Sequence, residues 1–162
     1  AWISALQGTS PTAIVLTRQA LPQYTGSGKD ALKGGYVLED CDGAPDVLLV
    51  ATGSEVETCV KAKAMLAEQG VNARVVSMPC MEEFEKQSAE YKDSVLPANV
   101  KARVCVEAGS PYSWYKYAGA TGEIIGMDGF GASGPAKTLF DNFGFTAENV
   151  VEKALRSIEN SK

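Results

Sequence analysis

Two apolar runs on either side of an amphipathic segment place the strongest constraint on how this chain can fold. Residues 46–52 (DVLLVAT) and 73–78 (ARVVSM) are rich in β-branched side chains, as in strands buried on both faces of a parallel sheet. Gly70 is a natural helix stop between them. Five apolar residues in the intervening segment share one helical face: Val56, Cys59, Val60, Leu66 and Ala67. This pattern predicts a β-α-β unit with parallel strands and a right-handed crossover.

The same alternation continues to the end of the chain. Further strands are expected at residues 36–38, 103–107 and 123–128, and helices at residues 82–91, at about residues 135–143 and from Thr146 onward. Ser54 is placed to cap the helix that follows the first buried strand. Alternating strands and helices predict a three-layer α/β/α domain with a mostly parallel, about five-stranded sheet.

The first 35 residues follow a different pattern. Residues 2–6 look like the end of a helix, residues 13–17 (AIVLT) like a buried strand, and residues 22–35 are rich in Gly and Pro. We therefore expect residues 1–21 to be the tail of another domain, residues 22–35 to be a linker, and residues 36–162 to form the main domain. A strand without sheet neighbours loses its hydrogen-bonding partners, so residues 1–20 are expected to fray.

Charge and hydropathy exclude several kinds of partner. The net charge of the 162 residues is −5 and no basic run is present, which argues against a nucleic acid or an anionic membrane as the main partner. No stretch approaches the roughly 20 apolar residues that a membrane-spanning helix needs. No membrane partner is therefore expected.

Cysteine and histidine usage restricts the chemistry. The chain has four cysteines and no histidine, so Ser–His and Cys–His nucleophilic pairs cannot form within it. No Cys-x-x-Cys pair is present, and a metal site is not expected. Cys59 and Cys105 lie in apolar segments and are interpreted as small core residues. Reduced thiols suit a cytoplasmic location, or a plastid if the source is photosynthetic.

Three short motifs suggest ligand sites, and each has a simpler explanation. Residues 129–134 match G-x-G-x-x-G, but no second strand and acidic residue follow, so a glycine-rich turn is favoured over a dinucleotide site. The turn at Gly53 could present a helix N-terminus to an anion, although Glu55 and Glu57 would repel it. Cys80 has no histidine or nearby basic residue to activate it, so an ordinary cysteine is favoured over a nucleophile.

For two further features, composition alone leaves more than one interpretation open. Four aromatic residues lie close together in the sequence: Tyr112, Trp114, Tyr115 and Tyr117. They could form a ligand-stacking surface, a subunit interface or ordinary packing. Arg18 follows an apolar run, and an arginine at the end of a strand can hold a phosphate with two parallel hydrogen bonds. A surface arginine is the more common case.

The order of several motifs resembles that of transketolases almost from end to end. They are LTRQ with LP at residues 16–22, ATGSEV at residues 51–56, RVVSMP at residues 74–79, EAG and WYKY at residues 107–117, FGAS with Pro135 at residues 130–135, and FGFT with ENV at residues 143–150. Gly134 stands where the family usually has Ala, and Ser113 where it usually has Gly. These departures affect turns and put no chemistry in doubt.

The resemblance implies a fragment of an enzyme that transfers a two-carbon ketol unit between sugar phosphates. In that family, thiamine diphosphate with Mg²⁺ or Ca²⁺ and the catalytic histidines belong to the N-terminal and middle domains, so no catalytic, cofactor-binding or metal-binding residue is expected here. Residues 1–21 would then close the middle, pyrimidine-binding domain. Arg18 matches the family's arginine that binds the substrate phosphate. The C-terminal domain itself is implied to be non-catalytic, structural or regulatory, within a homodimer.

Three alternatives remain at this point. The chain could be an independent small-anion-binding module that uses the strand ends near Gly53 and Gly109. It could be a purely structural dimerisation domain. It could also be the corresponding domain of a related thiamine enzyme such as a deoxyxylulose phosphate synthase, although the LTRQ and FGAS motifs favour transketolase.

Overall fold

A five-stranded, mostly parallel sheet forms the centre of the structure, a computed structural model that describes residues 1–162. The strands lie in the order β1-β3-β2-β4-β5. Their bounds are β1 Tyr36–Glu39, β2 Val47–Ala51, β3 Ala73–Ser77, β4 Arg103–Val106 and β5 Glu123–Ile125. Strands β2 to β5 are parallel to one another, and β1 is antiparallel to β3 at one edge. The predicted fold class and the β-α-β unit are confirmed.

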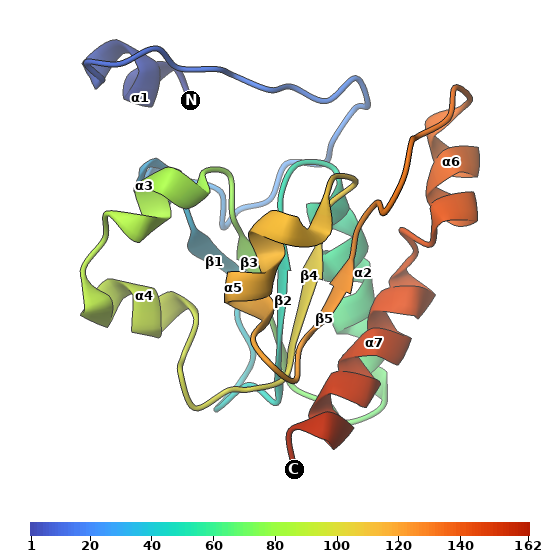
Figure 1. Ribbon diagram of the computed structural model, residues 1–162. Coiled ribbons are helices and arrows are strands. Elements are labelled where there is room, and N and C mark those ends of the chain that lie inside the picture. The colour runs from blue at the N-terminus through green and yellow to red at the C-terminus, as the bar shows by residue number, and fades with distance from the viewer.

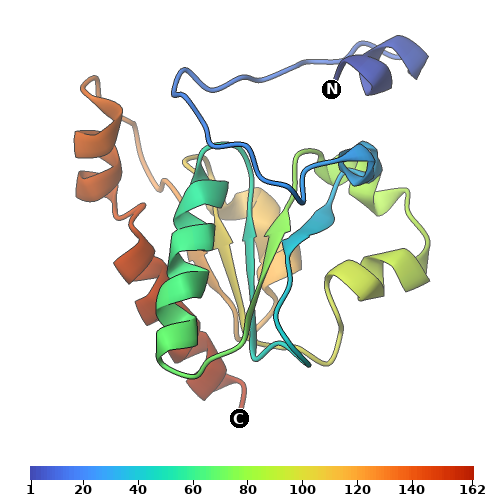
Figure 2. The ribbon, with the colours of Figure 1, turned by 180° about the vertical axis from the view of Figure 1, so that it is seen from behind.

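Helices cover both faces of the sheet (Figure 1). One face carries α2 (Glu55–Glu68) and α7 (Ala147–Asn160), and Figure 2 shows α2 in front of the sheet from that side. The other face carries α3 (Met81–Glu85), α4 (Ala89–Val95) and α5 (Tyr115–Ala118). The remaining helices are α1 (Trp2–Gln7), α6 (Ala136–Phe143), and the 3-10 helices η1 (Lys29–Lys33) and η2 (Pro111–Trp114). None of these helices has the length and apolar character needed to cross a membrane.

Strand β2 is the centre of the core because all five of its residues are buried. Successive side chains point to opposite faces, so β2 contributes to two separate hydrophobic clusters. Val47, Leu49 and Ala51 pack with α2 and α7, whereas Leu48 and Val50 pack toward the helices of the other face. A continuous apolar strand is therefore the sequence signature of a layer covered on both sides.

Helix α2 has most of its predicted features, but the predicted cap and one predicted face residue are wrong. Gly70 follows it with a φ of +74°, a conformation that glycine adopts without strain. The Ser54 hydroxyl does not cap the helix and instead donates a hydrogen bond to the Glu55 carboxylate over 3.2 Å. Ala67 is exposed, and the buried face lies further toward Thr58 and Ala62.

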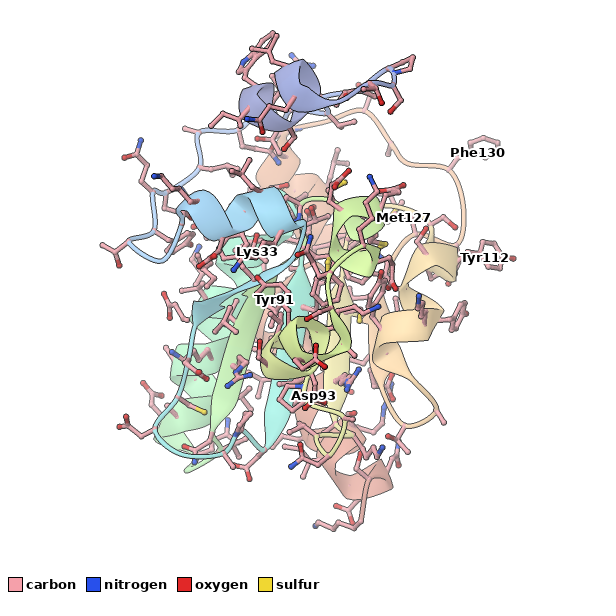
Figure 3. The ribbon with its side chains drawn as sticks, turned by 90° about the vertical axis from the view of Figure 1, so that its left-hand side faces the viewer. Lys33, Tyr91, Asp93, Tyr112, Met127 and Phe130 are labelled. Atoms are coloured by element: carbon pink, nitrogen blue, oxygen red, sulfur yellow. The ribbon has the colours of Figure 1, made fainter.

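The single helix predicted at residues 82–91 is two short helices, α3 and α4. Ser88 separates them, and its hydroxyl accepts a hydrogen bond from the Tyr91 amide, which makes it a true N-cap. The Tyr91 hydroxyl then donates to the Gly35 carbonyl over 2.9 Å, and the Lys33 ammonium lies 4.4 Å from the Tyr91 ring centre (Figure 3). The cap at Ser88 therefore begins a new helix instead of continuing α3. The hydroxyl and ring of Tyr91 connect α4 to the segment before β1.

The strand predicted at residues 13–17 does not form. These residues have no sheet partner, and the side chains of Val15 and Leu16 are 93% and 80% exposed. Helix α1 buries none of its residues. An apolar run becomes a strand only where a neighbouring strand accepts its hydrogen bonds, and none lies beside this segment (Figure 1).

The segment predicted as a linker, residues 22–35, packs against the main domain at two of its glycines. Gly34 has a φ of +84° and lies close to the backbone of Cys80 and Phe84, and Gly26 lies close to the Leu38 carbonyl. Any side chain at these glycines would meet backbone atoms, so the segment is seated rather than free. The domain boundaries themselves stay predictions.

A buried serine on α7 joins two strands that α7 covers. The Ser157 side chain is fully buried; its hydroxyl accepts a hydrogen bond from the Arg103 amide over 3.0 Å and donates one to the Thr121 carbonyl over 2.9 Å. Arg103 begins β4 and Thr121 precedes β5. One hydroxyl therefore satisfies two backbone groups that the sheet leaves unpaired.

We predict that Ser157→Ala lowers the free energy of unfolding by about 2 kcal/mol, because it leaves a partly buried amide and a partly buried carbonyl without their hydrogen-bond partner. Urea denaturation of the 162-residue chain measures this change. Ser133→Ala, in the exposed glycine-rich loop, is the matched control and should change stability by less than about 0.5 kcal/mol. Equal effects of the two substitutions would contradict the bridging role of Ser157.

Candidate functional site

The carboxyl ends of the two central parallel strands form the candidate site. Ala51 of β2 pairs with Val106 of β4, so the residues that follow them leave the sheet side by side. Each strand is followed by a turn that contains a glycine and a glutamate, with Glu55 at the start of α2 and Glu107 directly after β4. Open α/β sheets bind ligands at this edge, which makes it the first place to examine.

Glu55 is a buried acid. Its side chain is only 5% exposed, and the Ser54 hydroxyl donates to one of its oxygens. Burial raises the pKa of Glu55 above its ordinary value, the nearby negative charge of Glu107 raises it further, and hydrogen bonds from Ser54 and backbone amides oppose the rise. The proton therefore stays on Glu55 to a higher pH than on an exposed glutamate.

The Glu107 carboxylate is held by a side chain from the face of the sheet opposite to α2. The Trp114 indole nitrogen donates to one Glu107 oxygen over 2.6 Å, and the Trp114 side chain is fully buried. The Met127 amide donates to the Gly109 carbonyl over 2.8 Å, which fixes the loop after β4 to the loop after β5. The two carboxyl groups thus lie at one edge of the sheet but are anchored by different layers.

The charge of this edge does not suit an anionic ligand. Glu57 lies in the same first turn of α2 and pairs with Lys61 over 2.6 Å. No group of three or more Asp, Glu, Cys or His side chains is arranged to hold a metal ion. The strand ends near Gly53 and Gly109 therefore lack the positive charge that the small-anion alternative needs.

The aromatic group predicted from the sequence divides into two parts. Trp114 and Tyr117 are buried with ring centres 6.1 Å apart, and the Tyr117 hydroxyl donates to Glu85 over 2.8 Å. Tyr112 and Tyr115 are exposed, and Figure 3 shows Tyr112 pointing away from the domain on the same side as Phe130. Half of the group is therefore core, and half lies on the surface.

The cysteines and the glycine-rich motif take structural positions. Burial raises the pKa of the Cys105 thiol to about 12 and that of the Cys59 thiol further still, so both are inert core residues, as predicted. The Cys80 thiol donates a hydrogen bond to a Glu82 carboxylate oxygen over 3.5 Å. The motif at residues 129–134 is an exposed loop between β5 and α6.

Arg18 lies on the N-terminal segment that crosses above the carboxyl edge of the sheet (Figure 2). Its side chain is exposed. Its neighbour Thr17 lies near the turn after β2, because a Cβ added to Gly53 would lie 3.7 Å from the Thr17 methyl carbon. Arg18 is therefore next in sequence to a residue near this edge of the sheet, and its role as a phosphate-binding residue stays a prediction.

Sequence reasoning missed the Glu55–Glu107 pair. Glu55 comes three residues after the predicted strand 46–52, and Glu107 is the last residue of the predicted strand 103–107. Carboxyl ends of parallel strands meet at one edge, so a signal was present. What it lacked was the strand order, which places β2 beside β4 rather than at a distance.

Transketolases match the chain closely in sequence. Transketolase 2 of Vibrio parahaemolyticus is 50% identical over 158 residues, which cover 95% of this chain and 24% of that protein. Transketolase 2 of Escherichia coli is 53% identical over 147 residues, which cover 89% of this chain and 22% of that protein. The chain therefore spans about a quarter of the length of these curated relatives.

Solved transketolase structures have the same fold. A Pichia stipitis transketolase in complex with sedoheptulose 7-phosphate has a TM-score of 0.80 and 45% identity, and the match covers 88% of this chain and 20% of that one. Transketolase from Campylobacter jejuni has a TM-score of 0.82 and 35% identity, covering 95% of this chain and 23% of that one. The transketolase-like C-terminal domain family matches residues 34–146. The chain belongs to this family.

The described residues do not fit thiamine diphosphate and its metal ion. A diphosphate needs cations or free backbone amides, and the sheet edge presents Glu55, Glu57 and Glu107 instead. The structure contains no group of acidic, cysteine or histidine side chains that could hold a divalent ion. No step of ketol transfer is therefore assigned to these residues.

We predict that replacing Glu55 with Gln removes a pH-dependent loss of stability. Because folding raises the pKa of Glu55, its contribution to stability is complete below the ordinary value of 4.5 and is lost as the pH rises through the raised value. Glu55→Gln stays neutral, so its free energy of unfolding should improve relative to the unaltered chain as pH rises above 4.5.

Urea denaturation at a series of pH values measures this difference. Glu68→Gln, on the exposed side of the same helix, is the control and should show no such trend. A difference between Glu55→Gln and the unaltered chain that is independent of pH would show that Glu55 titrates normally.

Proposed function

We propose that the chain is the C-terminal part of a transketolase, the enzyme that transfers a two-carbon ketol unit between sugar phosphates. The observation that carries this proposal is about 50% identity to transketolases over 95% of the chain, together with the matching fold. The parent enzyme would use thiamine diphosphate with Mg²⁺ or Ca²⁺ and act as a homodimer. The carboxylate-lined sheet edge supports a domain that holds neither the cofactor nor the metal ion.

The proposed roles of the three segments follow their order along the chain. Residues 1–21 would complete the pyrimidine-binding domain, residues 22–35 would connect the domains, and residues 36–162 would be the C-terminal domain. The exposed apolar side chains of the first segment support this division, because Trp2, Val15 and Leu16 need a partner that the sheet does not supply.

Arg18 is proposed to bind the phosphate of the sugar substrate. Its guanidinium is exposed on an extended segment, so both of its donor edges are free to approach an anion. The carboxylates of the sheet edge would not compete with Arg18 as a phosphate site. The domain would then contribute to substrate binding without taking part in the chemistry.

Steady-state kinetics of the intact enzyme that contains this chain tests the proposal. Arg18→Ala should raise KM for a sugar phosphate by about 30-fold, the loss expected for a charge-assisted pair worth about 2 kcal/mol. KM for the corresponding unphosphorylated sugar should change little, because that substrate never uses the guanidinium.

Lys29→Ala removes an exposed cation further along the chain and serves as the control. It should leave both KM values unchanged. Absence of ketol transfer in the intact enzyme, or equal effects of Arg18→Ala on both substrates, would overturn the proposed function.

A further inference from the structure

The loop that runs from β5 to α6 contains an aspartate followed directly by a glycine, Asp128–Gly129 (Figure 1). Both residues are exposed, and the exposed stretch continues to residue 138. The loop is anchored before this pair by the Met127 amide, which donates to the Gly109 carbonyl over 2.8 Å. No backbone hydrogen bond holds residues 128–134. The pair therefore lies in a part of the chain whose backbone is free to rotate.

An aspartate that precedes a glycine can convert to isoaspartate without an enzyme. The glycine nitrogen attacks the carboxyl carbon of the protonated aspartate side chain; a carbon–nitrogen bond forms, and the hydroxyl leaves with the amide proton as water. The product is a cyclic succinimide. Water then adds to the backbone carbonyl carbon of this ring and breaks its bond to nitrogen, so that the chain runs through the former side chain. One water is lost and one is taken up, so the mass is unchanged.

Two conditions limit this reaction in a folded protein, and the loop meets both. The glycine nitrogen must be able to turn toward the side chain, and the Gly129 amide donates no hydrogen bond that would resist this rotation. The nitrogen must also be unhindered. Glycine has no Cβ of its own, and a Cβ built at Gly129 would have no other atom within 4 Å.

The second Asp–Gly pair of the chain, Asp42–Gly43, is held more firmly. It lies in the turn between β1 and β2. Before the pair, the Arg74 guanidinium donates to both carboxylate oxygens of Asp40, over 2.8 Å and 2.9 Å. After it, the Asp46 amide donates to the Asn72 carbonyl over 2.8 Å. A turn fixed on both sides resists the backbone rotation that the attack requires, so this pair is expected to react more slowly.

We propose that Asp128–Gly129 is a site of spontaneous modification, where isoaspartate accumulates in preference to every other aspartate of the chain. The reaction depends on the loop alone and does not rest on the proposed function. Its product lengthens the backbone between β5 and α6 by one methylene carbon and leaves the former backbone carboxyl group as the side group. The site would thus present an isoaspartyl carboxylate, the chemical class of substrate that a carboxyl-methylating repair enzyme takes.

Peptide mapping of the folded 162-residue chain after prolonged incubation tests this proposal. Trypsin cleaves after lysine and arginine, so it places the two Asp–Gly pairs on separate peptides, residues 117–137 and residues 34–61. The 117–137 peptide should acquire a second chromatographic peak of the same mass. An endoprotease that cleaves before aspartate should leave this second species uncut at position 128, because it does not recognise isoaspartate.

Two glycine variants form a matched pair. Gly129→Ala should abolish the second peak, because its methyl group hinders the attacking nitrogen. Gly131→Ala should keep the peak, because it leaves the Asp–Gly pair intact. Neither position has a φ in the left-handed region or an atom within 4 Å of an added Cβ, so both variants should fold normally and have the urea midpoint of the unaltered chain.

The outcomes decide both the site and its structural cause. Absence of the second peak, its persistence in Gly129→Ala, or as much isoaspartate in residues 34–61 as in residues 117–137 would overturn the proposal. Incubation in urea supplies the test of the cause. The two Asp–Gly pairs should then react at similar rates, because the turn between β1 and β2 no longer holds Asp42. A preference for Asp128 that is unchanged in urea would show that the fold does not select the site, and would overturn the structural argument.

Discussion

The burial of β2 on both faces is the constraint on which the rest of the structure depends. Its five residues are buried, and they pair with β3 on one side and β4 on the other. A strand without solvent contact requires helices on both faces and parallel neighbours reached by crossovers. The two hydrophobic clusters, the three layers and the common edge where the strands end all follow from this requirement.

That common edge brings together the carboxyl groups that follow two neighbouring strands. Parallel strands deliver Glu55 and Glu107 to one place, and burial keeps Glu55 inclined toward its neutral form. An edge lined with carboxyl groups is unsuited to hold a diphosphate.

Most of the fold could be predicted from local sequence patterns. The errors arose where the structure of a segment depends on the strands or side chains that lie beside it. Residues 46–52 and 73–78 predicted their strands because a buried strand carries its own apolar signal. Residues 13–17 carry a similar signal but have no strand beside them, so the same pattern failed. The break at Ser88 depends on a cap that competes with helix continuation. The Glu55–Glu107 pair required the strand order, which local sequence does not contain.

The central claim is that the cofactor chemistry belongs to regions outside this chain. Calorimetric titration of the 162-residue chain with thiamine diphosphate and Mg²⁺ tests it most directly. The account predicts no heat beyond that of dilution, because the sheet edge presents carboxylates and no group of side chains is arranged to hold a metal ion. Saturable binding at micromolar concentration would show a cofactor site within the domain and would contradict the account.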